Sequence, residues 1–112
     1  MSAISSHVLD TSLGKPAASL SVSLARLEGG AFLELGQGLT DADGRIKHLL
    51  GAHQLEAGLY RLSFEAGAHY RALGRDSFYE RVEIQFHVTD PSQHYHVPLL
   101  LSPFGYSTYR GS

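Results

Sequence analysis

Apolar side chains recur at every second position in three stretches of the chain, residues 20–24, 60–64 and 82–88. Successive side chains of a β-strand point to opposite faces, so this period of two predicts strands with one face on a core. The longest stretch alternates polar residues with the apolar Val82, Ile84, Phe86 and Val88. A first strand is predicted over Val8–Pro16, where it ends in a Gly/Pro turn.

One segment departs from this alternation. Residues 65–75 are rich in alanine, with Tyr70 and Leu73 three positions apart and Gly74 at the place where helices often end. These features predict a single helix of about two turns. A loop containing the same alanines is the alternative.

Turn residues and a proline set the limits of the remaining strands. Residues 40–45, with the sequence TDADGR, predict a turn, because aspartate bonds its own backbone and glycine accepts a positive φ. The last strand, YHVPLLLS, contains Pro98, which cannot donate a ladder hydrogen bond and predicts an edge, a bulge or a gap. Short strands separated by turns favour an all-β sandwich or barrel.

Composition narrows the class of protein. The 112 residues fit a single domain, 1–112, and 43% apolar with 18% charged residues indicates a folded chain. A net charge of −2 gives no basic surface for nucleic acid or an anionic membrane, and the lack of cysteine excludes disulfides and thiol chemistry. No stretch approaches the roughly 20 apolar residues of a membrane helix, and no secretory signal is visible, so we expect a cytoplasmic protein.

Histidine is the residue type with the clearest chemical potential. The chain has seven, and His94 and His96 would share one side of a strand, with Tyr95 opposite. Such a pair can bind zinc, but no third and fourth ligand lie near it in the sequence, so no metal is predicted. His7 and Arg45, taken alone, suit ordinary structural or surface roles. These residues by themselves do not select a reaction.

Three segments carry a resemblance to a known family. HVLDTSLGKPA at residues 7–17, TDADGR at residues 40–45 and HYHVPLLLSPFGYSTYRGS at residues 94–112 resemble the 5-hydroxyisourate hydrolases, the transthyretin-related enzymes of urate breakdown. GLYRLSFEAGAHYRALG between them is similar to the strand–helix segment of the same fold. The terminal Tyr-Arg-Gly-Ser is the most specific part, because hormone-carrying transthyretins lack it. Glu80 departs from the family, which often has proline there.

The resemblance implies a fold, an assembly and a reaction. The fold is a transthyretin-like two-sheet β-sandwich with one short helix. The assembly is a homotetramer, whose channel the chain ends would line, and the exposed apolar run Leu99–Leu101 would need such cover. The reaction is hydrolysis of the ring amide of 5-hydroxyisourate to 2-oxo-4-hydroxy-4-carboxy-5-ureidoimidazoline, with no cofactor and no metal.

The resemblance also assigns site residues. His7 and His96 fall at the catalytic histidine positions. We assign His96 as the general base and His7 as its partner or orienter, although the sequence leaves open which of the two histidines is the base. The remaining members are the catalytic Arg45 and Ser112, with Tyr109 and Arg110 as substrate contacts beside His7 and Arg45. Arg110 could instead make a purely structural pair. A transthyretin-like carrier of an aromatic molecule is the main alternative function, and an adhesion-type sandwich without a pocket is the third.

Overall fold

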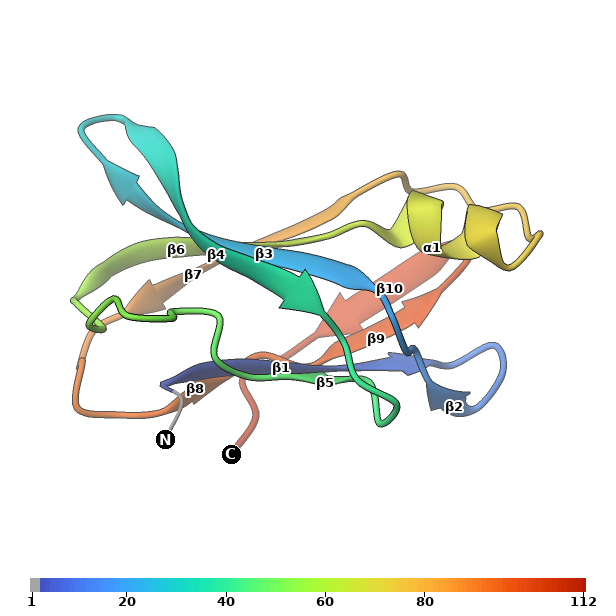
Figure 1. Cartoon of the computed structure of the whole chain (residues 1–112), viewed down its shortest axis with the longest axis horizontal. Coiled ribbons are helices and arrows are strands. Elements are labelled where there is room, and N and C mark those ends of the chain that lie inside the picture. Colours follow the sequence, from blue (N-terminus) through green and yellow to red (C-terminus); the bar gives the residue numbers. More distant parts are fainter. Residues whose placement is uncertain (1–2) are drawn as a thin grey trace.

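The three alternating stretches become three strands of a four-stranded antiparallel sheet in the computed structural model, which describes residues 3–112. The fourth strand, β4, was not predicted. The strands of this sheet follow the order β4-β3-β6-β7 (Figure 1). Their bounds are β3 Ser21–Glu28, β4 Ala31–Leu39, β6 Gly58–Phe64 and β7 Val82–Val88. The alternation also identified the inner face, since Val22, Leu24, Tyr60, Leu62, Phe64 and Val82 are fully buried.

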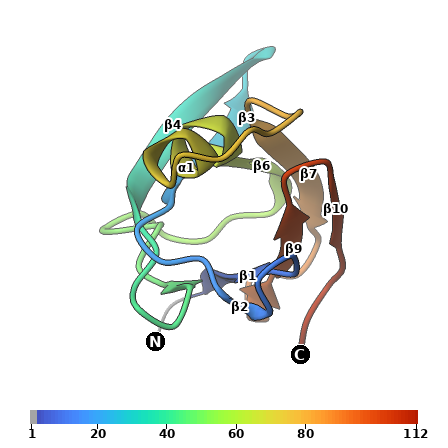
Figure 2. The ribbon, with the colours of Figure 1, turned by 90° about the vertical axis from the view of Figure 1, so that its right-hand side faces the viewer.

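A second, six-stranded sheet is built around the first strand, β1 (Ile4–Asp10). The other strands are β2 Lys15–Pro16, β5 Arg45–Ile46, β8 Tyr95–His96, β9 Leu99–Ser102 and β10 Gly105–Thr108. β8 and β9 both run parallel to β1, whereas β2 and β5 pair with it antiparallel. The two sheets form the two layers seen end-on in Figure 2, so the predicted two-sheet β-sandwich is confirmed.

The predicted bounds of the first strand were wrong. β1 begins at Ile4 and ends at Asp10, and the chain then turns so that Lys15 pairs back onto Asp10. The Asp10 carboxylate accepts the amide of Ser12 at 3.0 Å and that of Leu13 at 3.3 Å. An aspartate that bonds the backbone two residues on makes a turn, and this turn interrupts what the sequence presents as one continuous strand.

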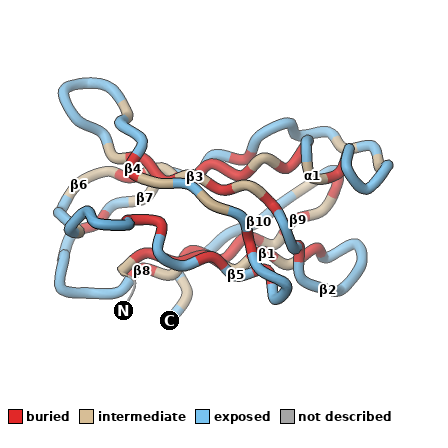
Figure 3. Tube along the Cα trace, viewed as in Figure 1, coloured by how far each residue is buried: buried red, intermediate tan, exposed pale blue. Residues whose placement is uncertain are grey.

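The core lies between the layers, where Figure 3 shows the buried residues of both sheets. Along β1, Ile4, Ser6, Val8 and Asp10 are buried at 2% exposure or less, whereas His7 and Leu9 are only partly buried. The expectation of an exposed apolar run was wrong, because Leu99 and Leu101 also point into this core. Only Leu100, on the opposite side of β9, is partly open to solvent.

Pro98 falls in a gap, as predicted. β8 ends at His96 and β9 begins at Leu99, so neither strand needs an amide hydrogen from Pro98. The Pro98 carbonyl accepts the Thr108 hydroxyl at 2.7 Å, and the Val97 amide donates to Ser5 of β1 at 3.0 Å. The gap therefore stays anchored to the sheet on both sides.

The alanine-rich segment forms the predicted helix, α1 (Ala66–Ala72). Gly74 has φ +70°, its amide donates to Arg71 at 3.0 Å, and the Arg75 amide donates to Tyr70 at 2.9 Å. This paired closure satisfies carbonyls of the last turn. Glu80, the departure from the family, holds α1 through two hydrogen bonds from Arg71 at 2.7 and 2.8 Å. Within residues 3–112, no helix is long and apolar enough to cross a membrane.

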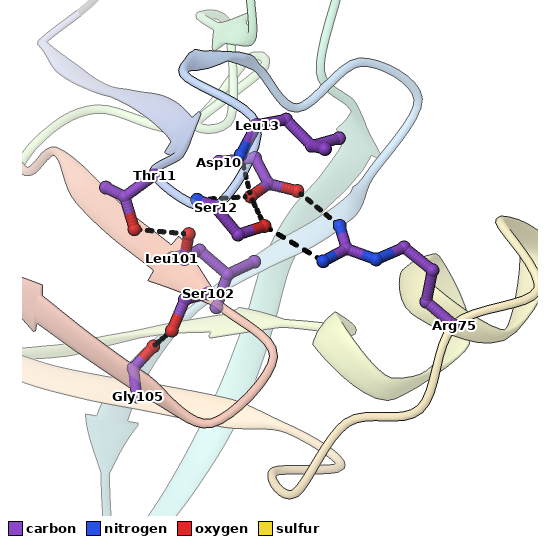
Figure 4. Close-up of polar contacts among 8 residues, drawn as sticks. All are labelled: Asp10, Thr11, Ser12, Leu13, Arg75, Leu101, Ser102 and Gly105. Carbon is purple, nitrogen blue, oxygen red and sulfur yellow. Dashed lines mark hydrogen bonds and ion pairs between the residues drawn. The ribbon is translucent and has the colours of Figure 1, made fainter.

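A polar cluster fastens the end of α1 to β1 (Figure 4). The Arg75 guanidinium lies 3.6 Å from the buried Asp10 carboxylate and donates to the Ser12 hydroxyl at 3.1 Å. Tyr70 is fully buried beside them, and burial together with the negative Asp10 raises its pKa to about 12. The cluster joins the helix to the six-stranded sheet at the end of the molecule opposite the chain termini (Figure 1).

Candidate active site

Predicted site residues from β1, β5 and β8 lie together on the outer face of β1. Ser5 and His7 are two positions apart, so both side chains point away from the core. Register pairs Ser5 with His96 of β8 and His7 with Arg45 of β5, and paired residues share a face of the sheet. The pairing of strands distant in sequence thus places both histidines and the arginine on one surface.

A cavity of about 570 Å³ opens on this surface. Arg45, His96 and Ser112 line it, which brings together three of the predicted site residues. His7 lies on the same face, next to Arg45 in the sheet, but does not itself line the cavity.

The lining of the cavity is mainly basic. Lys47 and His48 stand beside Arg45, and no aspartate or glutamate side chain is among the described residues that line it. Such a surface suits an oxygen-rich or anionic ligand.

The imidazole of His96 is held at its Nδ1 atom. The Ser5 hydroxyl oxygen lies 2.8 Å from that nitrogen and 3.1 Å from Nε2 of His94. Ser5 is only 7% exposed, so this contact is protected from solvent. The rings of His94 and His96 lie on the same side of the strand, as predicted, with centroids 6.4 Å apart and Tyr95 buried opposite.

The environment of His96 favours the neutral form of its ring. Burial lowers the pKa of His96 below the ordinary value, and electrostatic interactions with His94, His7 and Arg45 lower it further. An imidazole with a lowered pKa has a free nitrogen lone pair at neutral pH. His96 is therefore able to accept a proton there.

The chain end is fixed against His96. The Gly111 amide donates to the His96 carbonyl at 2.8 Å in an isolated antiparallel bridge. A β-carbon at position 111 would stand 2.6 Å from His96 Cδ2, closer than atoms can approach, so only glycine fits there without displacement. This contact delivers Ser112 to the cavity.

Tyr109 and Arg110 do not line this cavity. Both line a second hollow of about 250 Å³ beside β7 and β8. The Arg110 guanidinium is 4.4 Å from the centre of the Tyr95 ring and donates to the Gln93 side chain at 2.9 Å. Arg110 thus makes structural contacts within this chain, with the Gln93 amide, the His94 carbonyl and the Tyr95 ring rather than with a carboxylate.

Comparison with known proteins identifies the family. The model of the HIUase/Transthyretin family matches residues 4–111. The chain belongs to this family. It is 46% identical to a 5-hydroxyisourate hydrolase of Caulobacter vibrioides over the whole of both chains. The names of such relatives confirm the prediction of a hydrolase.

Solved structures of the HIUase/Transthyretin family agree with this assignment. A structure of Klebsiella pneumoniae 5-hydroxyisourate hydrolase covers all of both chains with 44% identity and a TM-score of 0.87. Sea bream transthyretin, in complex with thyroxine, matches 97% of this chain and 94% of its own with 32% identity and a TM-score of 0.91. These likenesses confirm the predicted transthyretin-like sandwich, a fold that a 5-hydroxyisourate hydrolase shares with a transthyretin in complex with thyroxine.

Some residues of the site were missed by sequence reasoning. Ser5 stands two positions before His7 and Lys47 two positions after Arg45, so strand alternation could have placed both on the site surface. His48 is exposed and lines the cavity, and its positive φ of 52° turns the chain there. Within the described residues, no group of three or more potential ligands could hold a metal ion.

Proposed function

We propose that this chain hydrolyses the ring amide of 5-hydroxyisourate to 2-oxo-4-hydroxy-4-carboxy-5-ureidoimidazoline. The observation that carries the proposal is the position of the His96 imidazole, whose pKa is lowered by burial, in a cavity also lined by Arg45 and Lys47. A base beside cationic donors is what the attack of water on a carbonyl requires. Relatives named 5-hydroxyisourate hydrolase, 42–48% identical to this chain, support the choice of substrate.

In the proposed mechanism, His96 removes a proton from water as the oxygen attacks the ring carbonyl. The Arg45 guanidinium stabilises the oxyanion that forms, since its forked donors match two oxygen acceptors. The amide C–N bond then breaks and opens the ring, and the proton held by His96 passes to the ring nitrogen that is released. The carboxylic acid formed from the carbonyl gives its remaining proton to solvent and becomes a carboxylate. His7 orients the substrate next to Arg45. Ser112, which lines the cavity, contacts and supports the bound substrate. No cofactor or metal enters this scheme.

The complete site belongs to a homotetramer in this proposal. Several aromatic side chains are exposed in the protomer, with Phe78 at 72%, Phe104 at 70% and Tyr106 at 44%. Such a surface favours association with further copies. Tyr109, 57% exposed, is a substrate contact in this assembly, and Arg110 combines its substrate contact with support of the terminal segment. The cytoplasmic location stays a prediction from the sequence.

A carrier of an aromatic molecule is the second candidate, favoured by the likeness to sea bream transthyretin. The two functions separate in one experiment, incubation with freshly generated 5-hydroxyisourate in ¹⁸O-labelled water. The hydrolase proposal predicts that the protein speeds formation of a product whose new carboxylate carries the label. Saturable binding of the substrate without any acceleration over the protein-free sample would instead support the carrier.

A further inference from the structure

One hydroxyl group connects two histidines of the site. Ser5 Oγ lies 2.8 Å from His96 Nδ1 and 3.1 Å from His94 Nε2, and Ser5 is only 7% exposed. The connection is a consequence of the sheet, because Ser5 of β1 is the register partner of His96 in β8. The backbone pairing of β1 with β8 therefore fixes the position of Ser5 relative to His96.

The chemistry of a hydroxyl limits what this contact can be. A serine hydroxyl donates one hydrogen bond and accepts others, and a neutral imidazole has one N–H and one bare nitrogen. When both rings are neutral, Ser5 therefore donates to one of them and accepts from the other. Either His96 donates from Nδ1 and Ser5 donates to His94, or both directions are reversed.

The surroundings of His96 distinguish the two directions. Its Nδ1 is taken by Ser5, and its Cδ2 edge is packed against Gly111, so Nε2 is the nitrogen left for a water molecule in the cavity. A general base needs this nitrogen without a proton. The proton of the neutral ring must then sit on Nδ1 and point at the Ser5 oxygen, and the Ser5 proton must point at His94 Nε2.

We propose that Ser5 is a positioning residue that fixes His96 in its Nδ1–H form, with His94 as the acceptor that sets the direction. The proposal rests on the proposed function, in which His96 is the base. It assigns Ser5 a role that depends on the direction of one hydrogen bond and not on packing. It also gives His94, which lines the same cavity, a part in positioning the base.

The charged groups around this pair set the conditions of any test. His7 faces His96 from β1, Arg45 from β5 and His94 from the segment before β8, and Lys47 and His48 line the same cavity. These basic groups disfavour protonation of His96, so its neutral form is accessible at mildly alkaline pH.

Nitrogen-15 NMR of the imidazole rings tests the proposal directly at such a pH. In the wild-type protein, we expect the proton of His96 on Nδ1. Ser5→Ala should shift the ring toward the Nε2–H form and lower kcat roughly fivefold to tenfold, the effect of one hydrogen bond, with KM little changed. Ser5→Thr keeps the hydroxyl and should restore both the tautomer and kcat.

A matched control is Ser102→Ala on the same sheet, which removes a partly buried serine whose hydroxyl bonds the Gly105 carbonyl. It should leave the His96 tautomer and kcat unchanged. A wild-type His96 with its proton on Nε2 would overturn the proposal, as would Ser5→Ala with an unchanged tautomer and kcat. The expected tautomers in a protein that does not hydrolyse 5-hydroxyisourate would support the role of Ser5 in positioning the ring and reject the proposed function alone.

Discussion

Gly111 lies against both the backbone and the imidazole ring of His96. The Gly111 amide donates to the His96 carbonyl at 2.8 Å, and a β-carbon at Gly111 would lie 2.6 Å from His96 Cδ2. The last residues of a chain are usually loose because little holds them. Here the end is tied to the strand that carries the proposed base, which accounts for its ordered position beside β8 (Figure 1).

We therefore expect Gly111→Ala to impair catalysis more than folding. The added methyl must push the His96 ring or the chain end aside, and a misplacement of about 1 Å can cost on the order of 100-fold in rate. The melting temperature should change little, because the contact lies at the edge of the sheet. The measurement is kcat and melting temperature for both proteins.

Gly105→Ala is the control for that experiment, since a β-carbon there meets only the Ser102 hydroxyl, at 3.8 Å. Its activity should stay close to wild type. Equal kcat values for Gly111→Ala and Gly105→Ala would show that the close approach has no bearing on the chemistry.

Deletion of residues 109–112 should abolish hydrolysis at little cost in global stability. The deletion removes Gly111 and Ser112 from His96 and the cavity, but β10 ends at Thr108 and the core strands stay intact. A fall of only a few degrees in melting temperature, roughly 1 kcal/mol or less, is expected. Retained activity would reject a role for the chain end, and loss of the fold would assign it a structural one.

The pH dependence of kcat/KM should show the lowered pKa of His96. The base must be neutral to act, so activity falls as pH decreases through its pKa in the free enzyme. Because burial and neighbouring positive charges lower this pKa, the fall should occur below the ordinary histidine value of about 6.5. An acid limb centred at or above that value would contradict the electrostatic account of the site.

Arg75→Met should destabilise the protein by about 1–3 kcal/mol, because it leaves the buried Asp10 carboxylate without its cation. The matched control is Arg71→Met, which breaks the ion pair with Glu80, where both side chains are more than 60% exposed. Exposed pairs contribute about 0–1 kcal/mol, so this loss should be smaller. Urea unfolding of both variants measures the difference, and equal losses would mean that Asp10 needs no cation.

The sequence predicted well what depends on local period and turn chemistry. Alternation identified β3, β6 and β7 and their inner faces, Gly74 marked the end of the helix, and Pro98 marked the gap between β8 and β9. These features follow from neighbouring residues alone, which explains why a single sequence shows them.

Features that depend on pairing between strands far apart in the sequence could not be predicted from local patterns. The contact of Ser5 with His96 depends on β8 lying parallel to β1, and the burial of Leu99 and Leu101 depends on which sheet face meets the core. The early end of β1 depends on the Asp10 turn, which competes with the strand pattern. Arg110 illustrates the limit of a motif, since its contacts with Gln93 and Tyr95 come from the folded chain.

The decay of ultraviolet absorbance of freshly generated 5-hydroxyisourate is the most direct test of the proposed function. Purified wild-type protein should accelerate the decay in proportion to its concentration. His96→Ala and His7→Ala should each lower turnover by about 100-fold or more, the scale of acid–base catalysis, while a β-type circular dichroism spectrum persists. A decay no faster than in the protein-free sample, or a folded His96→Ala variant with normal turnover, would contradict the account.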